Sequence, residues 1–133
     1  MSSTETRQQL LATAACFVVP DVFGTAEYYR DVLGFTFDTF YGDPPSFVIL
    51  GRDGIFVMLK QLAGAKPQTA DVGPPNFLDV YFWVNDLDAL AQELRGRGAD
   101  IVVDPTDRPI YEGRDLYLRD CDGRILCFGQ LNN

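Results

Sequence analysis

The chain has 133 residues, of which 47% are hydrophobic, and it carries a formal net charge of −8 at pH 7. The apolar fraction is sufficient for the core of one domain or of two fused half-domains. The acidity disfavours binding to nucleic-acid phosphates, and the absence of histidine excludes Ser-His-Asp and Cys-His catalytic sets.

The first half of the sequence predicts a strand, a helix and three further strands. Residues 1–10 are polar and are expected to form a flexible tail. Asp21 and Thr25 are residue types that begin helices, and Gly34 is typical of the position that ends one. The glycines of residues 51–54 predict a hairpin turn. The expected elements of this module (residues 11–61) are strand 12–19, helix 25–33 and strands 35–41, 46–50 and 55–61.

The second half predicts the same order of elements after a connector. Residues 62–76 contain three prolines and are turn-rich, which is typical of a link between two units. Asp86 can begin a helix, and Leu87, Leu90 and Leu94 recur at helical spacing. The expected elements of this module (residues 77–133) are strand 77–84, helix 86–97, strand 99–104, loop 105–113 and strands 114–120 and 125–130.

The two halves also share short sequence patterns. FVVPDV at 17–22 corresponds to FWVNDL at 82–87, and GIFVMLKQ at 54–61 corresponds to GRILCFGQ at 123–130. Both copies of the second pattern end in glutamine. Two similar units of this size predict a ligand site where they meet, because neither unit closes a cavity alone.

The motifs DVFGTAEYYRDVLGF (21–35), VNDLDAL (84–90) and DCDGRIL (120–126) resemble those of the vicinal oxygen chelate superfamily. This superfamily includes glyoxalase I, extradiol dioxygenases and bleomycin-resistance proteins. The resemblance extends over about residues 12–130 and is closest to the bleomycin-resistance branch. It implies an α+β fold of two βαβββ modules that form a cup-shaped mixed sheet, and it implies a homodimer.

The resemblance also assigns four positions to the divalent metal that enzymes of this superfamily hold. These positions lie on the first and last strand of each module, and here they are Ala14, Met58, Asp79 and Cys127. One carboxylate, one thiol and one thioether fall short of the three or more oxygen or nitrogen donors that such a metal needs. We therefore expect no metal and no other cofactor.

Strand alternation predicts which side chains line the cavity. In strand 77–84, Val80, Phe82 and Val84 form an apolar set that suits the face beneath the helix, which leaves Asp79, Tyr81 and Trp83 for the cavity. The same rule places Phe56, Met58 and Cys127 in the cavity. Tyr81 and Trp83 are suited to stacking on a planar ligand, although Trp83 could equally fill the core.

Asp79 is unexpected in an apolar strand and requires a hydrogen-bond donor. It could hold a cationic group of a ligand, act as a general base, pair with Lys60 or Arg114, or lie exposed at the start of its strand. Cys127 is not expected to act as a nucleophile, because no cation near it in the sequence would lower the pKa of its thiol.

These observations lead to one main hypothesis and two alternatives. The main hypothesis is a metal-free protein that binds and sequesters a small planar or cationic compound, such as an antibiotic. The first alternative is a lyase or isomerase of the same superfamily with Asp79 as general base. The second is a domain with a vestigial cavity that associates with other proteins.

The sequence further predicts a cytoplasmic protein. It contains three cysteines, an odd number, and residues 1–11 lack the apolar core of a secretory signal. No apolar run is long enough to span a membrane, so no membrane partner is expected.

Overall fold

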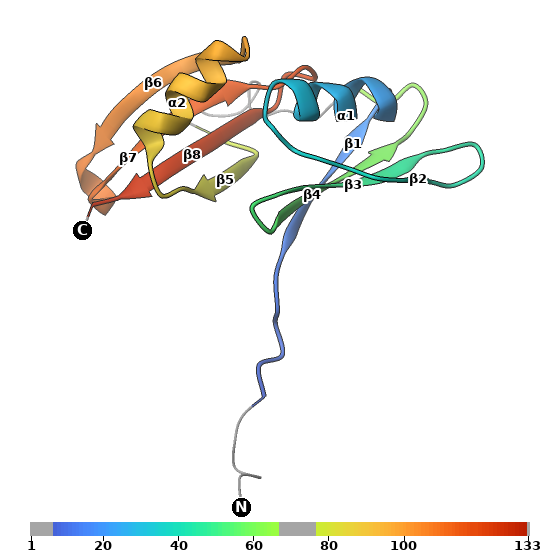
Figure 1. Cartoon of the computed structure of the whole chain (residues 1–133), viewed down its shortest axis with the longest axis horizontal. Helices are drawn as coiled ribbons and strands as arrows, with labels where there is room; N and C mark the ends of the chain where they lie inside the picture. The colour runs from blue at the N-terminus through green and yellow to red at the C-terminus, as the bar shows by residue number, and fades with distance from the viewer. Residues whose placement is uncertain (1–6, 67–76, 133) are drawn as a thin grey trace, which may run out of the picture.

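A computed structural model describes residues 7–66 and 77–132 of the chain (Figure 1). Each half contains a strand, a helix and three further strands, in this order. The elements of the first half are β1 (Ala14–Val19), α1 (Val22–Asp31), β2 (Phe40–Tyr41), β3 (Phe47–Arg52) and β4 (Ile55–Gln61). Those of the second half are β5 (Val80–Trp83), α2 (Leu87–Gly96), β6 (Asp100–Arg108), the short 3-10 helix η2 (Pro109–Tyr111), β7 (Gly113–Arg119) and β8 (Ile125–Leu131).

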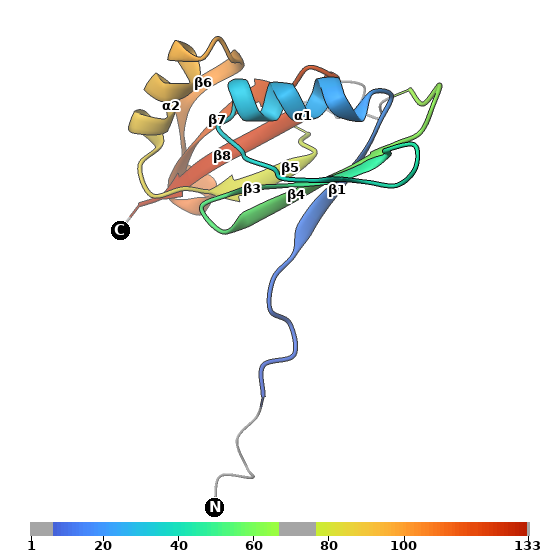
Figure 2. The same ribbon diagram turned by 45° about the vertical axis from the view of Figure 1, so that its right-hand side comes forward.

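The strands form two separate four-stranded sheets, ordered β1-β4-β3-β2 and β5-β8-β7-β6. In each sheet the first strand pairs in parallel with the last strand of its module, and the remaining pairs are antiparallel. Figure 2 shows α1 above one face of the first sheet. The expected α+β fold of two βαβββ modules is therefore confirmed.

The expected boundaries differ from the structure in the first module. Helix α1 begins at Val22 rather than residue 25, because Asp21 is its N-cap and accepts a hydrogen bond from the Phe23 N–H at 3.1 Å. Of the strand expected at 35–41, only β2 forms. The ring of Phe37 packs edge-on against that of Phe40, with 5.2 Å between centroids, instead of alternating along a strand.

In the second module, the structure differs from the loop that was expected at 105–113. Strand β6 continues to Arg108 and passes through Pro105. A proline lacks the N–H of a sheet ladder, but β6 is an edge strand, where this loss is tolerated. Register shifts on either side of Val103 accommodate the irregular stretch.

The structure explains why both repeats end in glutamine. The Gln61 side-chain oxygen accepts a hydrogen bond from the Val22 N–H at 2.9 Å, and that of Gln130 accepts one from the Leu87 N–H at 2.8 Å. Val22 and Leu87 are the first residues of α1 and α2, whose N–H groups have no partner within the helix. Each glutamine thus joins the last strand of a module to the start of its helix.

The two modules share one hydrophobic core on the helix-bearing sides of their sheets. Buried polar contacts join them at one end of this core. The Tyr29 hydroxyl donates to the Asp120 carboxylate at 2.7 Å. Arg124 donates to the Val18 carbonyl and lies 4.6 Å from the centroid of the Phe17 ring. Asp120 and Arg124 are only 5% and 3% exposed, so these contacts belong to the interior.

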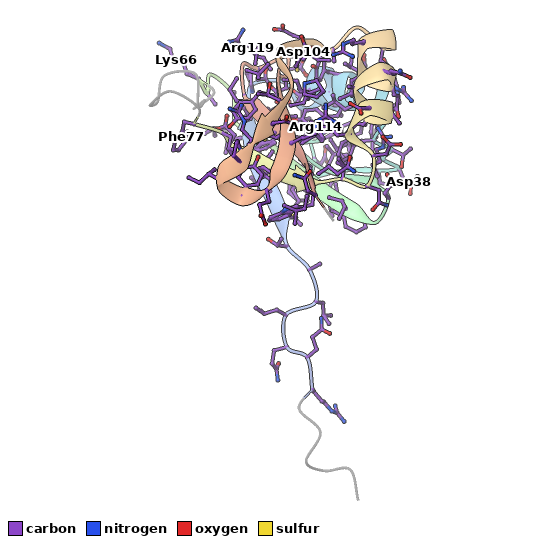
Figure 3. The ribbon with its side chains drawn as sticks, turned by 90° about the vertical axis from the view of Figure 1, so that its left-hand side faces the viewer. Asp38, Lys66, Phe77, Asp104, Arg114 and Arg119 are labelled. Carbon is purple, nitrogen blue, oxygen red and sulfur yellow. The ribbon has the colours of Figure 1, made fainter. Side chains whose placement is uncertain are left out.

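The expected tail and connector lie partly outside the described residues, namely at 1–6 and 67–76. Residues 7–13 run away from both sheets (Figure 1). Lys66 and Phe77, which flank residues 67–76, lie at the same end of the molecule (Figure 3). Within the described part of the chain, no helix is long and apolar enough to cross a membrane.

Candidate functional site

The side chains of β5 alternate between two environments, as the sequence pattern predicts. Val80, Phe82 and Val84 pack against the core that includes the helices. Tyr81 packs instead with Tyr117 and Cys127 on the opposite face of the second sheet, which α2 does not cover and which we call helix-free in this sense. The helix-free face of the second sheet is therefore the first candidate site.

Four aromatic side chains gather on this side of the sheet, and we call Tyr81, Trp83, Tyr111 and Tyr117 the aromatic face. The ring centroid of Tyr81 lies 5.0 Å from that of Trp83 and 6.5 Å from that of Tyr111. Trp83 is 71% exposed. An indole this exposed does not fill the core, and the rings beside it provide apolar surface for a planar molecule.

Two glycines allow the tyrosine rings to lie against the sheet. A Cβ atom at Gly129 would stand 1.7 Å from the Tyr81 hydroxyl oxygen, and one at Gly113 would stand 3.0 Å from the Tyr111 ring. Glycine within a strand often marks the close approach of another group, which is a signal that the sequence contained for this site.

A buried carboxylate organises the aromatic face, and sequence reasoning missed it. Asp115 is 2% exposed and accepts a hydrogen bond from Arg108 Nε at 2.8 Å. It also accepts one from the Tyr111 hydroxyl. Burial, together with this hydrogen bond, raises the pKa of Tyr111, so its hydroxyl stays protonated and acts as a donor. The Arg108 guanidinium lies 5.7 Å from the centroid of the Tyr117 ring.

Cys127 lies beneath this network and is fully buried. Burial and the nearby charge of Asp115 raise the pKa of its thiol well above the ordinary value. The thiol is therefore protonated at neutral pH, and a protonated, buried thiol lines a site without reacting in it.

Asp79 occupies a role that the sequence did not suggest. It lies just before β5, and its Oδ2 atom accepts a hydrogen bond from the Ile125 N–H at 2.8 Å. Its own N–H donates to the Ile125 carbonyl at 2.9 Å. Asp79 thus fastens the start of β5 to the start of β8. Arg114, one of its expected partners, lies 3.2 Å from Asp88.

The remaining predicted residues, Phe56 and Met58, lie on the first sheet. In β4, Val57 and Leu59 are buried in the core, whereas Phe56 is 45% exposed and Met58 is half-buried. They lie on the opposite face of β4 from that buried pair. The structure therefore divides the expected site between two separate sheets of one chain.

The four positions that the resemblance assigns to a metal do not fit one. Ala14 and Met58 belong to the first sheet and supply no hard ligand. Asp79 is bonded to the Ile125 N–H, and the Cys127 thiol is buried and protonated. Among the described residues, no three His, Cys, Asp or Glu side chains lie close enough to hold a metal ion.

A second candidate is a groove where the two modules meet on their helix-bearing sides. It has a volume of about 500 Å³ and is lined by residues of both modules. Trp83 is the only one of the predicted site residues that lines it. A site between the units was expected, but not on this side of the second sheet.

Comparisons with known proteins agree with the fold. The sequence model described as the Glyoxalase/Bleomycin resistance protein/Dioxygenase superfamily matches residues 10–128. The structure of TioX from Micromonospora sp. ML1 has a TM-score of 0.71 and 21% identity, over 92% of this chain and 99% of the other. A glyoxalase-related enzyme from Clostridium phytofermentans has a TM-score of 0.74 and 16% identity, over 96% and 100%. A glyoxylase/bleomycin resistance protein/dioxygenase domain from Frankia sp. EAN1pec has a TM-score of 0.72 and 22% sequence identity. The match covers 96% of this chain and 95% of the Frankia chain. No curated protein matches the sequence.

Proposed function

Because the chain belongs to the glyoxalase/bleomycin resistance protein/dioxygenase superfamily, we propose that it binds a small planar or cationic compound, such as an antibiotic, without a metal. The aromatic face is the binding surface of this proposal. The observation that carries it is the 71% exposed Trp83 beside the half-buried ring of Tyr81, because an indole this exposed contributes little to the core and leaves aromatic surface open to a ligand.

The structure gives less support to the alternative of a lyase or isomerase. A general base needs a carboxylate directed at the substrate. One oxygen of Asp79 is bonded to the backbone N–H of Ile125 and ties two strands together. Asp115 is buried and paired with Arg108, so it is shielded from a substrate as well. Binding without chemistry is therefore the function that this geometry favours.

Tyr81 provides the direct test of this proposal, with Trp83 as the reporter. Trp83 is the only tryptophan, so a stacked planar antibiotic should quench its emission. Replacing Tyr81 by alanine removes the ring beside the indole and should weaken binding by about 1–3 kcal/mol, by analogy with base–aromatic stacking. The measurement is a fluorescence titration with a panel of planar antibiotics, both cationic and neutral.

Tyr81→Phe is the matched control, because it keeps the ring and loses only the hydroxyl, which lies 3.5 Å from that of Tyr111. It should retain most of the affinity. Equal affinities for the wild-type protein and Tyr81→Ala would contradict binding at the aromatic face, and a panel with no binder would count against the function itself.

We further propose that the protein is a homodimer in which a second copy covers exposed apolar side chains on the helix-free side of the first sheet. Val18, Ile49 and Phe56 are 44%, 36% and 45% exposed there. Strands β1 and β5 are also edge strands that can accept another chain. Light scattering should give twice the chain mass of 14.8 kDa at micromolar concentration, and the mass of a single chain would contradict the dimer.

A further inference from the structure

We propose that the junction groove is a second small-molecule site, which takes an aromatic cation. The junction groove is the 500 Å³ space between the modules, whose floor includes Phe35, Phe82, Leu90 and Phe128 and whose rim includes Asp53 and Asp86. The groove lies on the other side of the second sheet from Tyr81 and Tyr117, because Phe82 and Phe128 belong to the core on the helix-bearing side. Trp83 borders both sites.

The groove exists only because the two modules are packed together. Phe35 and Asp53 come from the first module, whereas Phe82, Phe128 and helix α2 come from the second. Phe35 and Phe82 approach each other across the junction, with 6.4 Å between their ring centroids. A volume of about 500 Å³ lies within the range of about 300–1,000 Å³ that is typical of ligand pockets.

The floor of the groove is aromatic and flat. The rings of Phe82 and Phe128 stack with 4.9 Å between centroids and 16° between planes. Phe82 is half-buried, so part of this surface is open to the groove. Two nearly parallel rings offer one flat apolar surface, which favours a ligand with a planar apolar body.

The charged residues at the rim determine which sign of charge the ligand should carry. Arg52 is the one guanidinium that lines the groove, and its two terminal nitrogens bond the Glu93 carboxylate at 2.8 and 2.9 Å. These bonds raise the pKa of Arg52 and lower that of Glu93, so both remain charged and held by each other. Arg52 is therefore poorly placed to bind an anion.

The carboxylates of the rim remain accessible to a cation. The Asp53 side chain is 85% exposed, although it lies 3.5 Å from Arg52 Nε. Asp86 contributes from the other module, where one of its oxygens accepts the Ala89 N–H of α2. The lining thus contains three carboxylates and one guanidinium, in a chain of net charge −8. This balance favours a cationic group on the planar ligand.

Proflavine, a planar tricyclic cation, is a suitable probe, and Ala89 is the position at which to test it. Ala89 is exposed on α2 and lines the groove, so larger side chains there should not disturb the core. Ala89→Lys and Ala89→Glu add similar bulk with opposite charge. Ala89→Lys should weaken proflavine binding by about three- to tenfold relative to Ala89→Glu, because exposed charges interact modestly.

Backbone NMR during the same titration locates the probe. We expect the largest amide shifts at Phe35, Leu90 and Phe128. Tyr111→Ala removes a ring of the aromatic face and no residue of the groove lining, so the proflavine-dependent amide shifts of Phe35, Leu90 and Phe128 should remain while any shifts at Tyr117 and Cys127 diminish. Failure of the proposed function and failure of the junction groove therefore give different results. Trp83 lines the groove as well and is not used to separate the two sites.

Four results would overturn the proposal. Shifts confined to Tyr117 and Cys127 would place the probe on the aromatic face. Equal affinities for Ala89→Lys and Ala89→Glu, or no binding of proflavine at millimolar concentration, would show that the groove does not select a cation. A change in oligomeric mass caused by Ala89→Lys would show that a second copy of the chain fills the groove.

Discussion

Replacement of Asp120 by alanine is expected to lower the free energy of unfolding by about 2–4 kcal/mol. Asp120 accepts the hydroxyl of buried Tyr29 at 2.7 Å and the backbone N–H groups of Asp122 and Arg124, each at 2.9 Å. Its loss leaves these donors in the interior without an acceptor and takes a carboxylate away from the buried Arg124 guanidinium, 3.9 Å distant. Urea unfolding followed by circular dichroism measures the change.

Two variants serve as controls for this measurement. Asp120→Asn keeps the volume and one acceptor oxygen and should cost less than the alanine variant. Asp104→Ala removes an exposed ion pair, in which the Arg95 and Asp104 side chains are 50% and 74% exposed, and should cost less than about 1 kcal/mol. If Asp120→Ala costs no more than Asp104→Ala, the polar contacts between Asp120 and the first module do not hold the two modules together.

The doubled sequence pattern predicted the order of elements in both modules, and together with the family resemblance it predicted the fold. Strand alternation and helical spacing depend on a residue's immediate neighbours, so a single sequence reveals them. The element order followed from these patterns, and the repeated glutamines proved to have a structural reason, since Gln61 and Gln130 bond the first N–H groups of the helices. Boundaries were less certain, because cap contacts and edge positions decide them, as at Val22 and Pro105.

The contacts between modules could not be predicted in this way. The Tyr29 hydroxyl and the Asp120 carboxylate are 91 residues apart in the chain. No local pattern relates two positions so far apart. The contact of Asp79 within its own module was equally hard to predict, because Asp79 accepts a hydrogen bond from the backbone N–H of Ile125, and every residue except proline carries such a group. Strand alternation assigned Tyr81 to the helix-free side of its sheet. It contained no information on how the two sheets are placed relative to each other, so it could not predict that Phe56 and Met58 lie on a different sheet from Tyr81.

The network around Asp115 was missed for a related reason. Arg108 and Tyr111 were expected in a loop, so their distance in sequence from Asp115 did not indicate that the three side chains share one face of a sheet. In the structure, β6 reaches Arg108 and η2 brings Tyr111 back over Gly113. The pairing of β6 with β7 brings Arg108 beside Asp115. The Asp115 carboxylate then accepts hydrogen bonds from both Arg108 and the Tyr111 hydroxyl.

Replacement of Asp115 by alanine is therefore expected to affect both stability and binding. The variant leaves Arg108 without its buried partner and Tyr111 without its acceptor, which should cost about 2–4 kcal/mol of unfolding free energy. The Arg108 side chain is 26% exposed and can reach water, so the loss should stay below that of a fully buried pair. Release of Tyr111 should also alter the surroundings of Tyr81 and Trp83, which the emission of Trp83 reports.

The double variant Arg108→Met, Asp115→Leu separates the two effects. Replacing both members of a buried ion pair by apolar residues is often neutral or stabilising, so most of the lost unfolding free energy should return. The affinity for a planar ligand should not return, because the Tyr111 hydroxyl still lacks the acceptor that positions its ring. Recovery of both quantities in the double variant would contradict a positioning role of Asp115, since it would show that the aromatic face keeps its shape whenever the protein is folded.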